Sequence, residues 1–396
     1  IKNLILCAPA ECGLFPVAYV GTGHWPAWLK GSRAAFPSKD YGTADLSETG
    51  AWMLAYYRDI EPDPQLLERC IALGETFLQA QAADGSIPAW ISVRAGEPRP
   101  AGPLRAGAAS AAAGRFLADL FETTRDERHL HGARRTADFI IERVWPAQEW
   151  FDFETLFSPA AKPLSWRDAE SGLPPQGALA LSWAAGLLAR VYQGTDERRY
   201  LEYGLAAVDL LTLFQQVWDA PFLSYNTFGG FGATNISAQW SDARQAIFAP
   251  LLLQYYDLTG RREYFQRAIA ALRASFALLR VPENAPVAPG NVAGLAPAEY
   301  GTMPAHYGRA GGRLYPDWGA GSACAIAAWV QSHYGDVFID AVRGHAFGIN
   351  GCRVVNAHIS VRVIDVTIDR LPLYDEPEHI TPLSREAARG ILIKCV

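Results

Sequence analysis

Apolar residues along the chain recur with a helical period, and the helices they predict come in pairs. In each pair an apolar helix ends in aromatic residues, a short turn follows, and an amphipathic helix begins. The turns of five such pairs contain residues 56–59, 120–124, 191–195, 255–259 and 332–335. Each turn is followed by the first apolar residue of the second helix, at Leu66, Leu130, Tyr200, Tyr264 and Phe338.

The first helices of these pairs are expected to begin near residues 46, 105, 175, 239 and 319, a repeat of roughly 60 to 80 residues. Residues 108–120 and 178–189 are almost all small or hydrophobic, and a helix that is apolar all round is buried. The second helices carry charges on one face. We therefore predict a mainly α protein, an (α/α) toroid of five to six helical hairpins with the first helices inside.

Long loops rich in Gly, Pro and Trp join each hairpin to the next, and such loops are usually functional. They cover residues 83–104, 145–175, 218–238 and 281–318. Because all of them precede a first helix, we expect them at one end of the ring, which we call the mouth.

The two ends of the chain differ from this pattern. We divide the chain into an irregular N-terminal segment (1–40), an α/α-toroid catalytic domain (41–350) and a small β-containing C-terminal segment (351–396). Residues 355–368 alternate between apolar and polar, which predicts one or two strands. Short apolar runs at 391–396 and 4–7 predict a small β-containing module that could join the two chain ends.

Composition narrows the possible partners. The net charge is -6, and without a Lys/Arg cluster nucleic acid is not expected as a partner. No apolar run approaches the length of a membrane span, so no membrane partner is expected either. The six cysteines lack the spacing of metal ligands, and nothing in the sequence indicates a metal or a cofactor. Aromatic residues make up 12%, which fits a large helical core or a cleft that stacks on flat ligands. Oligomeric state and compartment stay open.

Acidic residues beside Trp at the starts of later inner helices are the most specific sign of chemistry. Trp166 precedes Asp168, Trp240 precedes Asp242, and Asp317 precedes Trp318. Asp45 and Glu48 lie near the start of the first inner helix. Two carboxyl groups that flank a glycosidic bond can cleave it, and aromatic faces shield such a site and stack on sugar rings. The candidate catalytic residues are, in order, Asp242, Asp168, Asp317 and Asp45. Asp is also a favoured N-cap, which is the alternative explanation for these positions.

A second set of residues would bind the substrate. Arg167, Arg244 and His306 could contact a carboxylate or sulfate, and the three Trp could stack on rings. With Tyr307, the substrate-binding candidates are Trp166, Arg167, Trp240, Arg244, His306, Tyr307 and Trp318. His306 and Tyr307 also support an alternative, a lyase or epimerase in which they move the C5 proton of a uronic acid. A third alternative is a glycan-binding toroid without catalysis.

The alternation of inner and outer helices, with Trp and Asp together at the mouth, resembles the six-hairpin glycosidase superfamily over residues 40–350. The resemblance includes residues 239–245 (Gln-Trp-Ser-Asp-Ala-Arg-Gln) and 315–319 (Tyr-Pro-Asp-Trp-Gly). It is nearest to the uronic-acid branch, with the unsaturated glucuronyl hydrolases, the epimerases and the toroid domains of heparinase-type lyases. It implies a glycoside hydrolase that cleaves an acidic, uronic-acid-containing oligo- or polysaccharide. It also implies one Asp near the first inner helix and one at a later helix, places that Asp45 and either Asp168 or Asp242 could fill.

Overall fold

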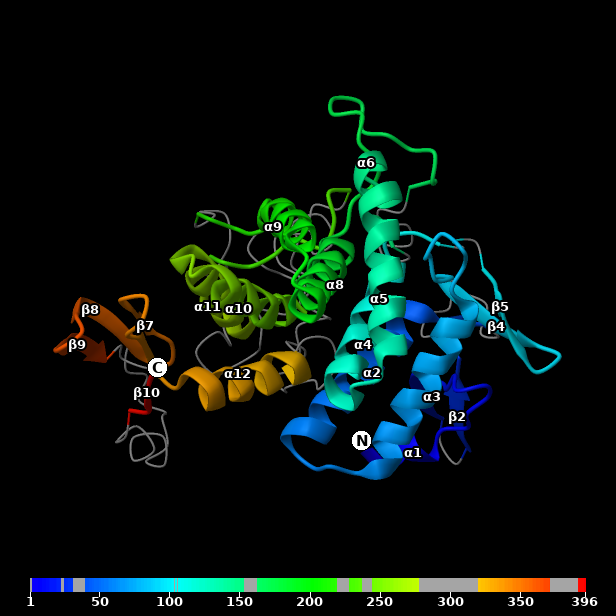
Figure 1. Cartoon of the computed structure of the whole chain (residues 1–396), viewed down its shortest axis with the longest axis horizontal. Helices are drawn as coiled ribbons and strands as arrows, with labels where there is room; N and C mark the ends of the chain where they lie inside the picture. Colours follow the sequence, from blue (N-terminus) through cyan, green and yellow to red (C-terminus); the bar gives the residue numbers. More distant parts are fainter. Residues whose placement is uncertain are drawn as a thin grey trace. The chain divides into compact units, whose positions relative to one another are not determined.

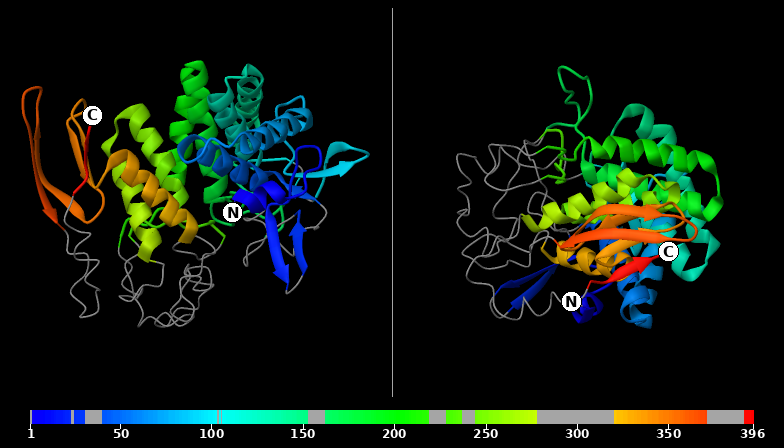
Figure 2. Two further views of the ribbon diagram at one scale, coloured as in Figure 1. Left: turned by 90° about the horizontal axis from the view of Figure 1, so that it is seen from below. Right: turned by 90° about the vertical axis from the view of Figure 1, so that its left-hand side faces the viewer.

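The computed structural model describes residues 2–22, 25–30, 40–102, 104, 106–152, 162–218, 228–236, 244–277, 320–370 and 391–396. Its contacts divide the chain into two compact units, Ile1–Phe214 with Ala233–Ser237 and Gln215–Gly232 with Ala238–Val396. Helices dominate both units (Figures 1 and 2). No helix among the described residues is long and apolar enough to cross a membrane.

Three helical hairpins make up most of the first unit. They are α2 (Thr43–Asp59) with α3 (Pro64–Ala80), α4 (Ser110–Thr124) with α5 (Glu127–Phe139), and α8 (Ala178–Thr195) with α9 (Arg198–Thr212). Helix α5 continues into a π-helical turn, η1 (Ile140–Val144), and a short helix, α6 (Trp145–Ala147). A hairpin forms at each of the three places expected in this part of the chain. Residues 56–59, 120–124 and 191–195 are still helical, however, and the turns directly follow them.

Local sequence explains how these hairpins turn. Asp63 and Asp126 cap α3 and α5, because each side chain accepts a hydrogen bond of 3.0 Å from the backbone N–H two residues later. Arg125 and Asp196 end α4 and α8 in the left-handed conformation, with φ of 62° and 58°. Charged residues thus occupy cap positions at these turns, and Asp63 and Asp126 cap through their side chains.

The first helices pack against one another. Helix α2 lies against α4, and α4 lies against α8 (Figure 1), with the second helices α3 and α5 packed on them. Contact is close because small residues line it: a Cβ on Gly50 would lie 2.6 Å from the ring of Phe116, and one on Gly114 would lie 2.9 Å from Leu187. Buried first helices covered by second helices are the layering of an α/α toroid, which confirms the predicted fold class.

Loops at the N-terminal ends hold the first helices in place. The residues just after α3 bind two of them: Thr43 of α2 donates from its N–H to the carbonyl of Ala89 at 3.0 Å, and the hydroxyl of Ser110 of α4 donates to Ile87 at 2.8 Å. In the same way, the N–H of Ala178 of α8 donates to the carbonyl of Ala233 at 2.9 Å. The long loops therefore meet the first helices at their N-terminal ends, as the sequence predicts.

The N-terminal part of the first unit holds short elements. They are α1 (Lys2–Cys7), β1 (Ala18–Thr22) paired antiparallel with β2 (Trp25–Leu29), and a sheet of β3 (Tyr41–Gly42), β4 (Trp90–Arg94) and β5 (Glu97–Pro100). The apolar run at 4–7, expected to join a β module with the C-terminus, is helical instead, so that expectation is wrong. Four apolar residues are too few for their spacing to separate a strand from one helical turn.

The second unit contains one complete hairpin and one single helix among its described residues. A 3₁₀ turn, η2 (Gln245–Ile247), leads into α10 (Phe248–Thr259), which pairs with α11 (Arg262–Ala277), and α12 (Ala320–Tyr334) packs beside them. A second helix was expected from Phe338, and this expectation is wrong. Residues 337–339 form a buried strand, because three consecutive large apolar residues suit the middle of a small sheet.

Two small sheets complete the second unit (Figure 2). In one, β6 (Val337–Asp340) lies between β10 (Ile393–Cys395), which is parallel to it, and β7 (His345–Gly348), which is antiparallel. In the other, β8 (Cys352–Ile359) pairs with β9 (Ile364–Arg370), which confirms strands in the C-terminal segment. The strands begin at Val337, ahead of residue 351. Aromatic rings join sheet to helices, and Phe265 of α11 stacks on Phe347 of β7 at 4.0 Å.

Candidate functional site

Three functional side chains occupy the same level of the three first helices in the first unit. Glu48, Arg115 and Trp183 each lie five residues after the first residue of their helix, which is Thr43 in α2, Ser110 in α4 and Ala178 in α8. Because the three helices begin at loops tied to their N-terminal ends, equal offsets bring these side chains together. They form the polar group that we call the Glu48 site.

Glu48 is the centre of this site. Its Oε1 accepts a hydrogen bond of 2.8 Å from the Arg115 guanidinium and one of 2.7 Å from the Trp183 indole N–H. Oε2 has no hydrogen bond to any described residue. The side chains of Glu48 and Arg115 are 27% and 21% exposed, whereas Trp183 is buried. One carboxylate oxygen is thus fixed by two donors, and the other remains available to a ligand.

Arg115 has one hydrogen-bond donor that is unpaired among the described residues. Its Nε is buried and has no hydrogen-bond partner among the described residues. An unpaired buried donor costs about 1–3 kcal/mol, so native proteins retain few of them, and those few call for an explanation such as a functional role. The Arg115 guanidinium binds Glu48 through Nη2 and its side chain is 21% exposed, so its exposed part could orient an anionic or hydroxyl-bearing ligand beside that carboxylate.

A second ion pair lies further along the first helices. Arg190 of α8 donates from Nε to Oδ1 of Asp119 on α4, and Asp119 is almost fully buried. Unlike Glu48, this carboxylate is closed off from solvent. We therefore interpret the Asp119–Arg190 pair as a contact that fixes α4 against α8 below the Glu48 site.

Asp45 lies one turn before Glu48 on α2. It is in the first turn of the helix and is not its N-cap, because the N-cap is Gly42, which makes no side-chain capping bond. Its carboxylate folds back over that glycine, where an added Cβ would lie 2.7 Å from Oδ2. Residues three apart on a helix share a face, so Asp45 and Glu48 point to the same side of α2.

The sequence candidates Trp166, Arg167 and Asp168 share one turn of the loop before α8. Oδ1 of Asp168 accepts hydrogen bonds from the N–H and the hydroxyl of Ser171, both 2.8 Å long. These bonds hold the pKa of Asp168 below its usual value. The Lys162 ammonium lies 5.7 Å from the centre of the Trp166 ring. A carboxyl with a lowered pKa stays ionised at neutral pH, so Asp168 is not suited to donate a proton.

Of the other sequence candidates, the structure describes only Arg244. Arg244 lies directly before η2 at the start of the fourth hairpin. Outside the described residues lie Trp240, Asp242, His306, Tyr307, Asp317 and Trp318. Their roles remain predictions.

A separate polar network in the second unit binds β6 to α10. Buried Asp340 accepts hydrogen bonds of 2.7 Å from the Tyr256 hydroxyl and from the Arg343 guanidinium. Burial opposes the ionisation of Asp340, but these bonds outweigh it and hold its pKa below the usual value. Nδ1 of His345 lies 3.3 Å from the Tyr256 hydroxyl. Since Asp340 is enclosed and paired, we interpret the network as an anchor for the sheet.

The comparisons with known proteins give matches to solved structures only. No family model and no curated protein matches the chain. A sugar epimerase from a ruminal bacterium is 13% identical, with a TM-score of 0.49 over 71% of this chain and 70% of that one. A family 76 α-mannanase of Bacteroides thetaiotaomicron is 15% identical, with a TM-score of 0.44 over 66% of this chain and 62% of that one.

A third match is the cellobiose 2-epimerase of Bacillus thermoamylovorans, 13% identical, with a TM-score of 0.45 over 62% of this chain and 63% of that one. The chain thus spans less than two thirds of the mannanase and of this epimerase. With identities this low, the function has to be argued from the residues of the chain itself.

Sequence reasoning named Glu48 only as a neighbour of Asp45 and missed Arg115 and Trp183. Both lie in helices that read as apolar throughout. The signal that could have found them is Arg115, the only charged residue in 108–118. A charge in a buried helix needs a partner, and the sequence offers two carboxylates: Asp119, one turn later in the same helix, and Glu48, at the same offset in the preceding first helix.

Proposed function

We propose that the chain is a carbohydrate-active enzyme, a glycoside hydrolase that acts on an acidic oligo- or polysaccharide, and that Glu48 is one of its two reacting carboxyl groups. The observation that carries this proposal is the half-bound carboxylate of Glu48. A carboxylate fixed at one oxygen and open at the other is positioned to act as a base or nucleophile toward a sugar. The sequence resemblance to the six-hairpin glycosidases supports the substrate class.

Arg115 and Trp183 position Glu48 in this proposal. The Trp183 indole can donate only one hydrogen bond, and Glu48 uses it, so Trp183 orients the carboxylate without changing its charge. Arg115 holds the same oxygen, and the exposed part of its guanidinium would bind a uronate carboxylate. Asp45, on the same side of α2, is our candidate for the second carboxyl group in this unit, and Asp168 would take part as a base. Asp242 and Asp317 are tested separately, by substitution to Asn.

Two other classes of function are alternatives to a glycoside hydrolase. A lyase or epimerase would use Tyr307 and His306, and a glycan-binding toroid would use the same aromatic residues without catalysis. They differ in their products. An elimination creates an unsaturated uronate, and a hydrolase for unsaturated uronides consumes one. An epimerase changes neither the number of double bonds nor the number of reducing ends, and a binding protein makes no product.

The test is an incubation of the purified protein with uronic-acid oligosaccharides, mannan and cello-oligosaccharides. Absorbance near 235 nm reports the unsaturated uronate, and reducing-end assays report hydrolysis. Glu48→Gln should lower the hydrolytic rate by about 10²–10⁴-fold, because Gln cannot act as base or nucleophile. Glu122→Gln is the matched control, since Glu122 is an exposed acid on α4 whose bond to Arg58 is 3.5 Å long. Equal rates for Glu48→Gln and wild type would refute the role of Glu48.

A further inference from the structure

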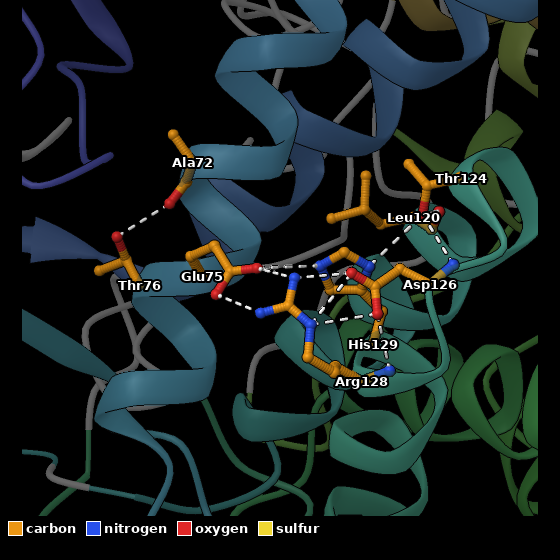
Figure 3. A network of polar contacts seen from close by, with 8 residues as sticks. All are labelled: Ala72, Glu75, Thr76, Leu120, Thr124, Asp126, Arg128 and His129. Atoms are coloured by element: carbon orange, nitrogen blue, oxygen red, sulfur yellow. Dashed lines mark hydrogen bonds and ion pairs between the residues drawn. The ribbon is translucent and has the colours of Figure 1, made fainter.

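Three potential metal ligands meet on the second helices of the first unit, away from the Glu48 site. Glu75 lies on α3, Asp126 is the N-cap of α5, and His129 lies in the first turn of α5 (Figure 3). One ligand atom from each lies within 4.8 Å of the other two. His129 Nε2 and Glu75 Oε1 are 3.9 Å apart. Two ligands that each lie about 2.0–2.2 Å from one Zn²⁺ are separated by roughly 3–4 Å, so small movements would close the set around an ion.

The contacts of His129 favour one position of its ring proton. The Thr124 hydroxyl donates its single hydrogen to the carbonyl of Leu120 at 2.8 Å, so toward its other neighbours it can only accept. One of these neighbours is His129 Nδ1, 3.5 Å away (Figure 3). A proton on Nδ1 suits this contact, and it would leave the lone pair of Nε2 to a metal ion. A histidine that donates through one nitrogen and presents the other to carboxylates is the arrangement found at metal sites.

Nε2 of His129 has no hydrogen-bond partner among the described residues, although the side chain is 1% exposed. It faces the Glu75 carboxylate, another acceptor. Two acceptors that face each other in a buried place repel unless a positive ion or a proton lies between them. The backbone leaves room for the ring, since a Cβ on Gly74 would lie 3.3 Å from Nε2.

A positive charge already lies between the two carboxylates, the guanidinium of Arg128. Its Nη2 is 2.7 Å from Glu75 Oε1 and 2.6 Å from Asp126 Oδ2. The Arg128 side chain is 63% exposed. It can therefore turn into water without leaving a buried charge behind, whereas His129 cannot leave its place. The carboxylates thus have a displaceable cation, and the histidine has none.

We propose that Glu75, Asp126 and His129 bind a divalent first-row transition metal ion, with Arg128 displaced toward solvent. One neutral imidazole and two carboxylates balance a charge of +2, and nitrogen with oxygen ligands suits Zn²⁺, Co²⁺ or Ni²⁺. Water would complete the coordination on the exposed side. The ion would clip α3 to α5, the second helices of two neighbouring hairpins. This site is independent of the proposed carbohydrate chemistry.

The experiment is a calorimetric titration of metal-stripped, full-length protein with ZnCl₂ at pH 7. We expect one ion per chain at this site. His129→Gln and Glu75→Gln should each weaken binding about tenfold or more. His131→Gln is the matched control, because His131 is exposed on the same helix two residues further on and should bind as wild type does. Arg128→Gln should bind Zn²⁺ more tightly, since it removes the competing cation.

Two measurements keep the proposal falsifiable. Because His129 is buried, its substitution could unfold α5, so circular dichroism and thermal unfolding of each variant are recorded first. Glu75→Gln changes a partly exposed side chain and therefore tests metal binding independently of that risk. The visible spectrum of the Co²⁺ form should lack thiolate charge-transfer bands. Three results would each overturn the site. The first is the absence of binding heat in both wild type and Arg128→Gln, the second is an unchanged Zn²⁺ affinity in Glu75→Gln, and the third is a Co²⁺ spectrum with thiolate bands.

Discussion

Single side chains in this protein act according to how far they are buried and what they are paired with, and Asp340 is the clearest case. Its pKa in the folded protein lies below the usual 3.8, despite burial, because Tyr256 and Arg343 donate to it. Its ionised form therefore stabilises the fold fully above pH 3.8, and this contribution is lost as the pH falls through the lower folded value.

We predict that Asp340→Asn lowers the free energy of unfolding by about 2 kcal/mol at pH 7, as expected for hydrogen bonds to a charged group. The difference from wild type should narrow as the pH falls below 3.8 and through the lower folded pKa of Asp340, because Asn does not titrate. Urea unfolding of wild type and Asp340→Asn at several pH values measures this difference in the free energy of unfolding. Asp369→Asn, which breaks an exposed ion pair with Arg353, should change little at any pH. A difference that does not depend on pH would show that the charge of Asp340 is unimportant.

The residues of the Glu48 site show how far the sequence alone leads. Glu48 stood out because it lies near the start of a first helix, where mouth residues were sought. Arg115 and Trp183 did not, because a buried helix with one Arg or one Trp reads as core. Their importance arises from the equal offset on three helices, and that becomes visible only when the exact first residue of each helix is known. Sequence patterns place helix ends to within a few residues at best.

Among elements, the close contacts of the first helices depend on glycine. We predict that Gly114→Ala lowers the free energy of unfolding by about 1–2 kcal/mol, because overpacking against Leu187 and Thr136 outweighs the gain in helix propensity. Thermal or urea unfolding measures it. Gly321→Ala is the control: a helical glycine of α12 whose added Cβ would meet none of the described residues within 4 Å. It should leave stability unchanged or raise it by up to about 1 kcal/mol.

Elements with a long, strongly periodic sequence were predictable, and short ones were not. The hairpins from α2 to α11 follow from apolar helices that end in aromatic residues, since each covers several helical turns. The predictions for residues 4–7 and for the segment at Phe338 were wrong for the same reason. A run of four apolar residues fits a strand and a helical turn equally well, and tertiary neighbours decide. For Phe338 the neighbours are β10 and β7, whose pairing with β6 no local pattern reveals.

At the scale of the whole molecule, binding and catalysis can be separated. Glu48, Arg115 and Trp183 all belong to the first unit, so a saccharide held by them must stabilise that unit by mass action, by about 2.7 kcal/mol at a hundred times its Kd. We predict that an acidic oligosaccharide raises the unfolding midpoint of wild type and of Glu48→Gln alike, because Gln still accepts from Trp183 and Arg115. Arg115→Gln should lose the shift. Scanning calorimetry with and without ligand measures all three.

The combination of the two readouts decides between an enzyme and a binding protein. In an enzyme, Glu48→Gln keeps the thermal shift and loses product formation, because the carboxylate reacts while Arg115 binds. In a binding protein, wild type shifts but forms no product, and Glu48→Gln cannot be told from it. A shift that survives in Arg115→Gln would locate the saccharide elsewhere, and the candidates at the predicted mouth, Asp242 and Asp317 among them, would then be the residues to substitute next.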